Sequence, residues 1–600
     1  MRIEEGFQPI PFSEENAYLN DPVLPSLLKR TLPRRQVHIC RFLLEIGPDL
    51  ERVGSEVVTT LRELSNSAKV FPPTLLQYDQ WGRRIDKLQT SEGWRELKAI
   101  AQREGLPGIF YHRKFREFSR IYGFAKMHLM VGDTNEIFCP MSMTDGTARV
   151  IELFGSPQMR KDILPRLVSR DPAFAFTSGQ WMTERPGGSD VSLTETTATS
   201  AGKVAVLGPQ YSLNGVKWFS SATDSEVSVA LARTGSAQDG SRGLSLFLVP
   251  LRLPLLRNPS DPVPPPTSNN ILVHRLKNKI GTHILPTAEL TLESSEAYLI
   301  GALGQGIKNI TPVLNITRLW SATASIGNLR KCLAIATSYA KVRSIHSGTV
   351  LLKDAPIHVE QLAGVNLVYR ALVHLTFGVV GLLGKVECGV ASPDEERRLR
   401  MLTPVAKAYA AEKACTAMEE AMTAMGGAGY MEENGFGRSI RDALVEKIWE
   451  GTIVVLAFDT VRSAQDPAHM ASFISWTASV TEACPDKLRE ELAPALQTLK
   501  KAVAELAGSY AKPLNPLIPR PALILLGSVT SSIYLLEHAI WSYSSGEPSS
   551  EVDVEVFRRW IFEGGMESAI ETVQRIRLNT AERVKLNSEL VFGQKRSTKL

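Results

Sequence analysis

The chain has 600 residues, more than one hydrophobic core usually holds, so three or four domains are expected. Hydrophobic residues make up 44% and charged residues 22%, as in an ordinary soluble globular protein. The net charge of +5 is too mild to imply nucleic-acid binding without a local basic patch. The six cysteines are scattered, and none of their spacings is typical of a metal or redox site, so reduced thiols in an intracellular protein are expected.

Residues 1–52 mix prolines with charges, which predicts an extension that wraps over a body. Their first residues show neither a secretory signal nor the arginine-rich pattern of a transit peptide. Helical patterning is expected over 53–70 and again from about 92 to 168, with a loop around 71–84 between them. We therefore predict an N-terminal helical domain at 53–171.

Short β-rich runs separated by turn residues replace the helical pattern near residue 172. The runs predicted as strands are 204–207, 211–213, 216–219, 227–232 and 244–249. The dipeptide Asn214-Gly215 predicts a turn between two of them, and the proline-rich stretch 258–270 predicts a loop. A β domain is expected at 172–298.

Helical periodicity returns at 305–345, 356–388 and 395–425, and the glycines from Gly426 to Gly429 predict a helix stop. This gives a helical domain at 299–467. A helical extension at 468–600 follows, with helices near 485–510, 521–543 and 551–578. The apolar stretch 521–541 is interrupted by polar residues, so it is interpreted as a buried helix and not as a membrane span. The predicted fold class is α+β.

Three segments carry residues suited to chemistry. Trp181 to Asp190 offers hydroxyls, exposed backbone N–H groups and two glycines, as the edge of a flat polar cofactor requires, although an ordinary glycine-rich turn has the same composition. Leu213 to Ser221 places two aromatic residues beside hydroxyls, which fits either a stacking surface for a ring or a hairpin with one buried aromatic.

The third segment runs from Arg438 to Thr452 and contains Glu450 between an apolar pair and a glycine. A carboxylate in apolar surroundings has a raised pKa and serves as a general base. The alternative for such a glutamate is an exposed position in a loop.

Together these segments resemble the acyl-CoA dehydrogenase superfamily. Met182-Thr183-Glu184 with Gly187-Gly188-Ser189-Asp190 is similar to its flavin-binding signature, and Lys217 to Ser220 resembles its second flavin segment. Met425 to Tyr430 resembles its Gly-Gly-x-Gly-Tyr motif, and Trp449 to Thr452 its catalytic stretch.

Further residues resemble the AidB branch of the superfamily. These are Gln8 to Pro11, Tyr78-Asp79, Gly82 to Asp86, Cys139-Pro140, Met143-Thr144, and a tryptophan before the glutamate. The resemblance covers roughly 8–580.

The resemblance implies FAD as cofactor and an acyl-CoA as substrate, with Glu450 removing the α-proton while the β-hydride passes to flavin N5. It implies flavin contacts for Met182, Thr183, Trp218, Phe219, Ser220, Gly451 and Thr452, with Ser189 near the pyrophosphate or the CoA. It also implies that Arg343 reaches the cofactor of a neighbouring subunit in a homotetramer. The chain departs from the family at Ile345 to Gly348, at Thr423, and at the apolar run Ile453 to Val455.

Two other functions stay open. An oxidase would share the first half-reaction and return the electrons to oxygen. A DNA-associated flavoprotein would use the basic residues of 575–600, although a solvated tail explains them as well and is favoured here. A nitroalkane oxidase is disfavoured because the base in those enzymes is an aspartate. The electron acceptor is not specified by the sequence.

The last three residues, Thr598 to Leu600, are close to a peroxisomal address, in which a small residue such as serine precedes Lys-Leu. A cytoplasmic or a peroxisomal location is therefore expected.

Overall fold

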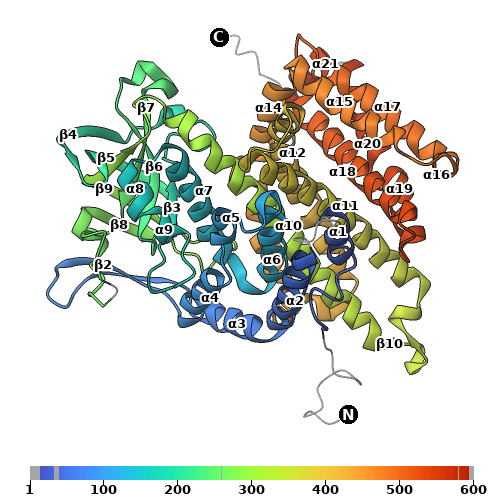
Figure 1. The fold of residues 1–600 in the computed structure, drawn as a ribbon, viewed down its shortest axis with the longest axis horizontal. Helices are drawn as coiled ribbons and strands as arrows, with labels where there is room; N and C mark the ends of the chain where they lie inside the picture. The colour runs from blue at the N-terminus through green and yellow to red at the C-terminus, as the bar shows by residue number, and fades with distance from the viewer. Residues whose placement is uncertain (1–13, 33–39, 259, 579, 594–600) are drawn as a thin grey trace.

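The computed structural model describes residues 14–32, 40–258, 260–578 and 580–593. The expectations based on residues 8–11 and 598–600 concern parts of the chain outside these ranges. Figure 1 shows a β-rich part on one side, long helices in the middle and further helices on the other side. The fold is α+β, as predicted.

The first part of the chain is mostly helical. Its helices are α1 (Leu24–Thr31), α2 (Cys40–Glu56), the π-helical turn η2 (Val57–Leu61), α3 (Arg62–Val70), α4 (Glu92–Arg103), α5 (Gly108–His112), η3 (Arg116–Phe118), α6 (Ser119–Thr134), η4 (Asn135–Ile137), α7 (Phe138–Phe154), α8 (Pro157–Asp162) and α9 (Leu164–Leu167). Helix α2 begins before residue 53, so the predicted start of the helical domain falls inside a helix.

A β-hairpin occupies the segment that was expected to be a loop. Strands β1 (Thr74–Tyr78) and β2 (Arg84–Gln89) pair antiparallel. The Asp79 carboxylate accepts hydrogen bonds from the N–H groups of Trp81 and Arg83, at 2.8 and 2.9 Å, and so closes the turn. The turn residues were recognised from the sequence, but the short strands beside them were missed.

The β domain is a seven-stranded sheet. Its strands are β3 (Ser178–Trp181), β4 (Thr197–Ala205), β5 (Gly208–Ser221), β6 (Val227–Arg233), β7 (Leu244–Pro250), β8 (Ile271–Leu276) and β9 (Thr287–Ile300). The strand order is β3-β6-β4-β5-β9-β7, β8 pairs with β9, and a further pairing between β6 and β7 closes the path. The predictions for β6 and β7 are confirmed; every residue of β7 is buried.

The predicted turn at Asn214-Gly215 is wrong, because both residues lie within the continuous strand β5. The register of β5 against β9 shifts between Leu213 and Asn214, and the Asn214 side chain accepts a hydrogen bond from Ser294 N–H at 2.8 Å. A Cβ on Gly215 would lie 2.4 Å from Thr196 Oγ1. The glycine therefore serves a close approach to a neighbouring segment and not a chain reversal.

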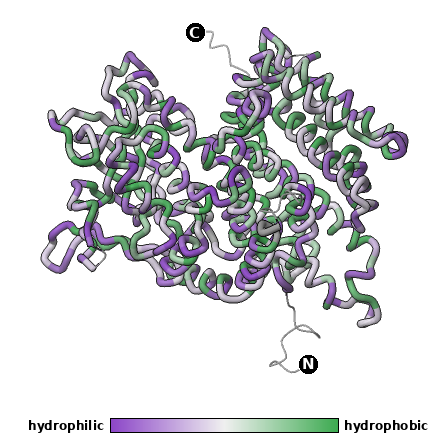
Figure 2. Tube along the Cα trace, viewed as in Figure 1, coloured by the Kyte–Doolittle hydropathy of each residue, from purple (hydrophilic) through white to green (hydrophobic). Residues whose placement is uncertain are grey.

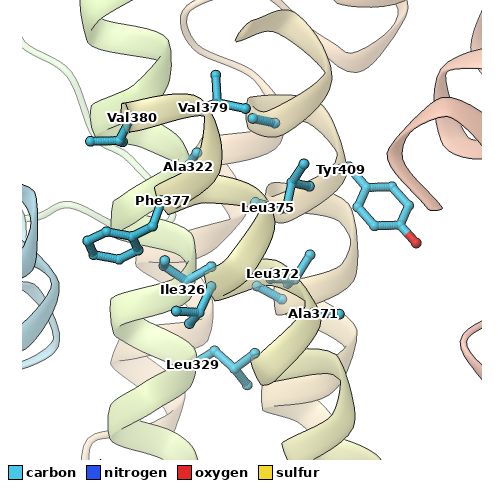
Figure 3. Close-up of a cluster of buried hydrophobic side chains, with 14 of the residues drawn as sticks. Ala322, Ile326, Leu329, Ala371, Leu372, Leu375, Phe377, Val379, Val380 and Tyr409 are labelled. Atoms are coloured by element: carbon cyan, nitrogen blue, oxygen red, sulfur yellow. The ribbon is translucent and has the colours of Figure 1, made fainter. Parts of the chain in front are cut away.

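Long helices follow the sheet. They are α10 (Gly306–Val342), α11 (Pro356–Glu387), α12 (Pro393–Thr423), α13 (Phe436–Leu444) and α14 (Ile453–Ala464). The predicted stop after α12 is confirmed, because Gly426 has a φ of 60° and begins the short η10 (Gly426–Tyr430). Between α10 and the short η9 (Leu352–Asp354) lie β10 (Ser344–Ile345), η8 (His346–Gly348) and β11 (Val350–Leu351). Figure 3 shows aliphatic side chains of α10 and α11 packed together, with Tyr409 of α12 directed toward the C-terminal helices.

The C-terminal extension consists of α15 (Pro467–Glu482), α16 (Asp486–Glu491), α17 (Ala493–Ser509), α18 (Pro519–Ser544), α19 (Ser550–Glu563), α20 (Met566–Leu578) and α21 (Thr580–Phe592). The predicted helix at 551–578 is divided into α19 and α20 at two glycines, Gly564 and Gly565. Helix α18 contacts α11, α12 and α14, and one hydrophobic cluster runs from Ala17 to Ile576. Figure 2 shows hydrophobic runs along these helices and hydrophilic residues along the outer loops.

Two helices, α11 and α18, are long and apolar enough to cross a membrane by length and composition alone. Most of the apolar window is buried within the fold in each of them, 78% in α11 and 83% in α18. Both are therefore core helices of the helical bundle.

Close packing between α11 and α18 predicts the effect of one substitution. A Cβ on Gly378 would lie 2.3 Å from the ring of Tyr534. We expect Gly378→Ala to lower the midpoint of thermal unfolding, because overpacking a core costs about 1–3 kcal/mol, more than alanine gains in helix propensity. The control is Gly364→Ala in the same helix, whose added Cβ meets no atom within 4 Å and should raise the midpoint slightly. Equal midpoints for the two variants would contradict this packing.

Candidate functional site

Glu450 lies on a tight turn between η12 (Val445–Lys447) and α14. Its φ is 55°, in the left-handed region that few residues other than glycine adopt, and the next residue, Gly451, has a φ of 102°. Thr452 then caps α14, because its Oγ1 accepts a hydrogen bond from Val455 N–H at 3.3 Å. The turn thus presents one carboxylate from a strained position that is fixed on both sides.

The turn is held by two buried cations from different helices. Arg318 Nε, on α10, donates to the backbone oxygen of Glu450 at 3.2 Å, and Lys407 Nζ, on α12, donates to that of Gly451 at 2.7 Å. Arg318 is itself oriented by Asp459 of α14 at 2.7 Å. Three helices therefore set the position of the Glu450 carboxylate.

The pKa of Glu450 is raised, as predicted, chiefly because the carboxylate is removed from water. Thr317 Oγ1 donates to Glu450 Oε2 at 2.5 Å and works in the opposite direction, as do the charges of Arg318 and Lys407. Gln180 of β3 also lowers this pKa, so the carboxylate faces the β domain. The predicted base thus lies where the helical bundle and the β domain meet.

The two segments that resemble flavin-binding motifs are joined in the β domain. Trp218 N–H donates to the backbone oxygen of Thr183 at 3.0 Å. Behind this contact, the buried Lys217 Nζ donates to Glu184 Oε1 at 2.5 Å and to the Leu231 oxygen at 2.8 Å. Glu184 also accepts from Glu195 N–H at 2.6 Å. A buried ion pair therefore fixes the segments to each other.

The remaining predicted cofactor residues differ in exposure. Met182 and Ser220 are buried, Phe219 and Ser189 are exposed, and Trp218 lies between these extremes. Lys277 Nζ lies 3.2 Å from the centroid of the Trp218 ring, a cation–π contact that the sequence did not reveal.

Unpaired polar atoms lie next to these segments. Within the described ranges, the buried Ser220 Oγ, Gln180 Oε1 and Trp181 Nε1 have no hydrogen-bond partner. Buried polar atoms are normally paired, so such a group indicates a surface that a polar ligand satisfies. A hydroxyl, an amide oxygen and an indole N–H suit the polar edge of a flavin ring, so these residues fit the cofactor of the superfamily.

Arg343 does not join the other predicted residues. It caps the C-terminus of α10, 26 positions beyond Thr317, which corresponds to roughly 40 Å along a helix. A contribution of Arg343 to this site within one chain is therefore excluded, and its predicted contact with a neighbour's cofactor stays a prediction.

Sequence reasoning missed Thr317, Arg318 and Lys407. Helix α10 is buried on nearly all sides around Thr317, so no polar face distinguishes that residue. Lys407 could have been found from the sequence, because a charged side chain inside the alanine-rich stretch of α12 needs a buried partner. A cavity of about 180 Å³ lies elsewhere, between the N-terminal segment and α10 and α11, and none of the predicted site residues lines it.

Three family descriptions match successive parts of this chain. The description "Acyl-CoA dehydrogenase, C-terminal domain" matches residues 304–463, and "Acyl-CoA dehydrogenase, middle domain" matches 179–295. "Adaptive response protein AidB N-terminal domain" matches 7–172.

Whole-chain relatives agree with these matches. Acyl-CoA dehydrogenase family member 11 of Caenorhabditis elegans is 34% identical over 98% of this chain and 93% of its own length. The chain belongs to the acyl-CoA dehydrogenase family. The putative acyl-CoA dehydrogenase AidB of Escherichia coli is 28% identical over 78% of this chain and 81% of its own length.

A solved structure of a relative covers nearly the whole chain. It is C. elegans ACDH-11 in complex with C11-CoA, which matches with a TM-score of 0.87 and 34% identity over 99% of this chain and 98% of that one. Within the family the chain belongs to the AidB-like branch, as its sequence predicted, and it is an oxidoreductase that acts on acyl-CoA.

The buried pair under the two cofactor segments yields a stability prediction. Lys217→Met leaves the Glu184 carboxylate buried without its cation, and breaking such a pair costs about 3–5 kcal/mol. We expect a clear fall in the midpoint of thermal unfolding, with partial recovery in the double variant Lys217→Met/Glu184→Gln. The control is Lys203→Met on exposed β4. If Lys217→Met had the same midpoint of thermal unfolding as the wild type, the stabilising role of this pair would be refuted.

Proposed function

We propose that this chain oxidises an acyl-CoA thioester with FAD as its cofactor, and that Glu450 is the base that removes the α-proton. The observation that carries the proposal is the Glu450 carboxylate on a strained turn beside Gln180 of the β domain, in a chain of this family. Bound FAD would supply the acceptor for the hydride that leaves the β-carbon.

The residues proposed to hold FAD are Met182, Thr183, Ser189, Trp218, Phe219, Ser220, Gly451 and Thr452, with Arg343 contributed by a neighbouring subunit of a homotetramer. Ser220 Oγ and the backbone around Thr183 supply hydrogen-bonding groups, and the Trp218 ring supplies a flat surface. The pair of Lys217 and Glu184 keeps these groups in register before any ligand binds.

Proton removal follows from the surroundings of the base. A raised pKa makes Glu450 a stronger proton acceptor once it is ionised, and the Thr317 hydroxyl stabilises that ionised form. The N–H of Glu450 donates no hydrogen bond within the described residues, so it is free to donate to the thioester oxygen and stabilise the charge that develops there. One residue would thus accept the α-proton and polarise the carbonyl.

The structure of ACDH-11 in complex with C11-CoA guides the choice of substrate. We propose that straight acyl chains of similar length be tested first. An oxidase that shares the proton-removal step remains the nearest alternative. Binding to DNA is less favoured, because the basic side chains Arg577 and Lys585 at the C-terminal end already pair with Glu505 and Glu589.

The proposal is tested by anaerobic titration of the purified, flavin-loaded protein with short, medium, long and branched acyl-CoAs. Loss of the oxidised flavin absorbance with one class supports the reaction and identifies the substrate class. Rapid return of the absorbance with oxygen distinguishes an oxidase from a dehydrogenase. A bound flavin that none of these thioesters reduces would contradict the proposed function.

Glu450→Gln should lower the rate of flavin reduction by about 10²–10⁴-fold, because the amide cannot accept the α-proton. Flavin content and thermal stability should stay close to those of the wild type. The matched control is Glu571→Gln, an exposed glutamate on α20. Full activity of Glu450→Gln with the active thioester would remove this residue from the mechanism.

Thr317→Val should move the low-pH limb of the reduction rate toward higher pH. The hydroxyl stabilises the ionised carboxylate, so its loss raises the Glu450 pKa further, and a higher pH is then needed to ionise the base. The control is Thr323→Val on the same helix, whose hydroxyl donates to the Leu319 oxygen. A shift toward lower pH would show that the Thr317 hydrogen bond does not stabilise the charged base.

A further inference from the structure

A second buried carboxyl group lies four residues before the base. Glu446, in η12, is fully buried. Its Oε2 accepts a hydrogen bond from Ser321 Oγ of α10 and another from Trp449 Nε1 at 2.5 Å. Glu446 therefore ties the residue directly before Glu450 to helix α10, so it helps to fix the turn.

The two oxygens of Glu446 have different surroundings. Oε2 is held as an acceptor by two donors, whereas Oε1 has no partner within the described residues. An exchangeable proton therefore belongs on Oε1. Burial raises the pKa of Glu446 to about 7, and the charge of Glu450 raises it as well. This carboxyl group thus changes charge in the pH range where an enzyme works.

Both carboxyl groups depend on the same cation. Lys407 is fully buried, and burial lowers its pKa to about 8, while the charges of Glu446 and Glu450 raise it. Its Nζ hydrogen-bonds to the Gly451 oxygen and forms an ion pair with neither carboxylate. Arg318, the other cation that acts on Glu450, already pairs with Asp459, so the shared ammonium group does not fully compensate both carboxylates and the two glutamates titrate as a coupled pair.

Other titratable groups also face this pair from the surrounding elements. They are Cys139 on α7, Glu136 on η4, Cys415 on α12 and Arg318 on α10. Burial raises the pKa values of both thiols and strongly raises that of Glu136. Glu446 differs from these groups because two donors hold one of its oxygens and because its pKa is raised to about 7.

We infer that Glu446 is a positioning residue for the base: it fixes the turn through Trp449, and its charge strengthens Glu450 as a proton acceptor. The inference rests on the proposed role of Glu450. With Glu446 neutral, the ionised form of Glu450 is stabilised by Lys407, Arg318 and Thr317, which makes it a moderate base. Loss of the Glu446 proton adds a second negative charge that shares the same cation, which makes Glu450 more basic.

A kinetic experiment measures this effect. In the wild type, the rate of flavin reduction should rise by about threefold as pH passes through 7, because the charge on Glu446 makes Glu450 a stronger base and the proton is only partly transferred in the transition state. Glu446→Gln keeps an acceptor for Ser321 and Trp449 but cannot become charged, so it should lose this step. Loss of the Lys407 proton would add a second rise, which should occur at lower pH in Glu446→Gln than in the wild type because the Glu446 charge raises the Lys407 pKa.

Two further variants separate position from charge. Trp449→Phe removes the indole donor, so it should lower the rate and keep the step but move it to higher pH, because the indole N–H lowers the pKa of Glu446. Glu446→Ala should lower the rate and lose the step. If Glu446→Gln keeps the wild-type pH profile, the charge plays no part and the inference is overturned.

An infrared titration of the resting flavoprotein tests the coupling without turnover. A buried protonated carboxyl group should titrate near pH 7 in the wild type, be absent in Glu446→Gln, and titrate at lower pH in Glu450→Gln, where the neighbouring charge is gone. An unchanged titration in Glu450→Gln would overturn the coupling even if no acyl-CoA reduces the flavin. Reduction of the wild-type flavin with no carboxyl titration near pH 7 would reject the inference and leave the proposed function intact.

Discussion

Two buried cations and the carbonyl oxygens they bind are the contacts on which this site depends. Arg318 and Lys407 lie on different helices, yet both donate to the backbone of the turn that carries Glu450. A charge buried in a helical bundle needs compensation, and here backbone oxygens and nearby carboxylates provide it. The same contacts that satisfy the cations hold the Glu450 turn in place, so the packing of the bundle also positions the site.

The helical extension belongs to the same core and does not form a separate module. Helix α18 packs on the helices that supply Lys407 and the turn, and the aromatic rings of Tyr409 and Tyr534 fill the positions left by glycines on the facing helix. Loss of α18 would expose the back of α12. The extension thus supports the site indirectly, by packing against α12 and α14 without contributing any of the predicted site residues.

Much of the fold could be predicted from the sequence because local pattern and tertiary role agree there. Strands β6 and β7 are apolar runs of strand length bounded by turns, and α11 is a long apolar helix that ends at a glycine-containing turn. Glu450 was found because it lies in a contiguous motif with an apolar flank. The hydrogen bond that joins Trp218 to Thr183 also unites two segments that had been singled out separately.

The rest depends on contacts between distant segments. Asn214-Gly215 has the composition of a turn, but the approach of Thr196 keeps it inside a strand. Thr317, Lys407 and Glu446 come from three segments that meet only in space. Thr317 and Glu446 have no local pattern that distinguishes them from ordinary polar residues in a helix, and the alanine-rich surroundings of Lys407 indicate burial without naming its partner. Pairing between sequence-distant charges decides their role, and a single sequence does not contain that information.

The left-handed backbone at Glu450 places the stability of the fold and the presence of a carboxylate at this position in conflict. A glycine at this position would adopt the same φ of 55° without the steric cost that a side chain incurs there. A lineage that lost the need for proton abstraction would therefore drift readily to glycine at residue 450 and gain a more durable protein. A glutamate at this position therefore costs stability, and a role as the proposed base would account for that cost.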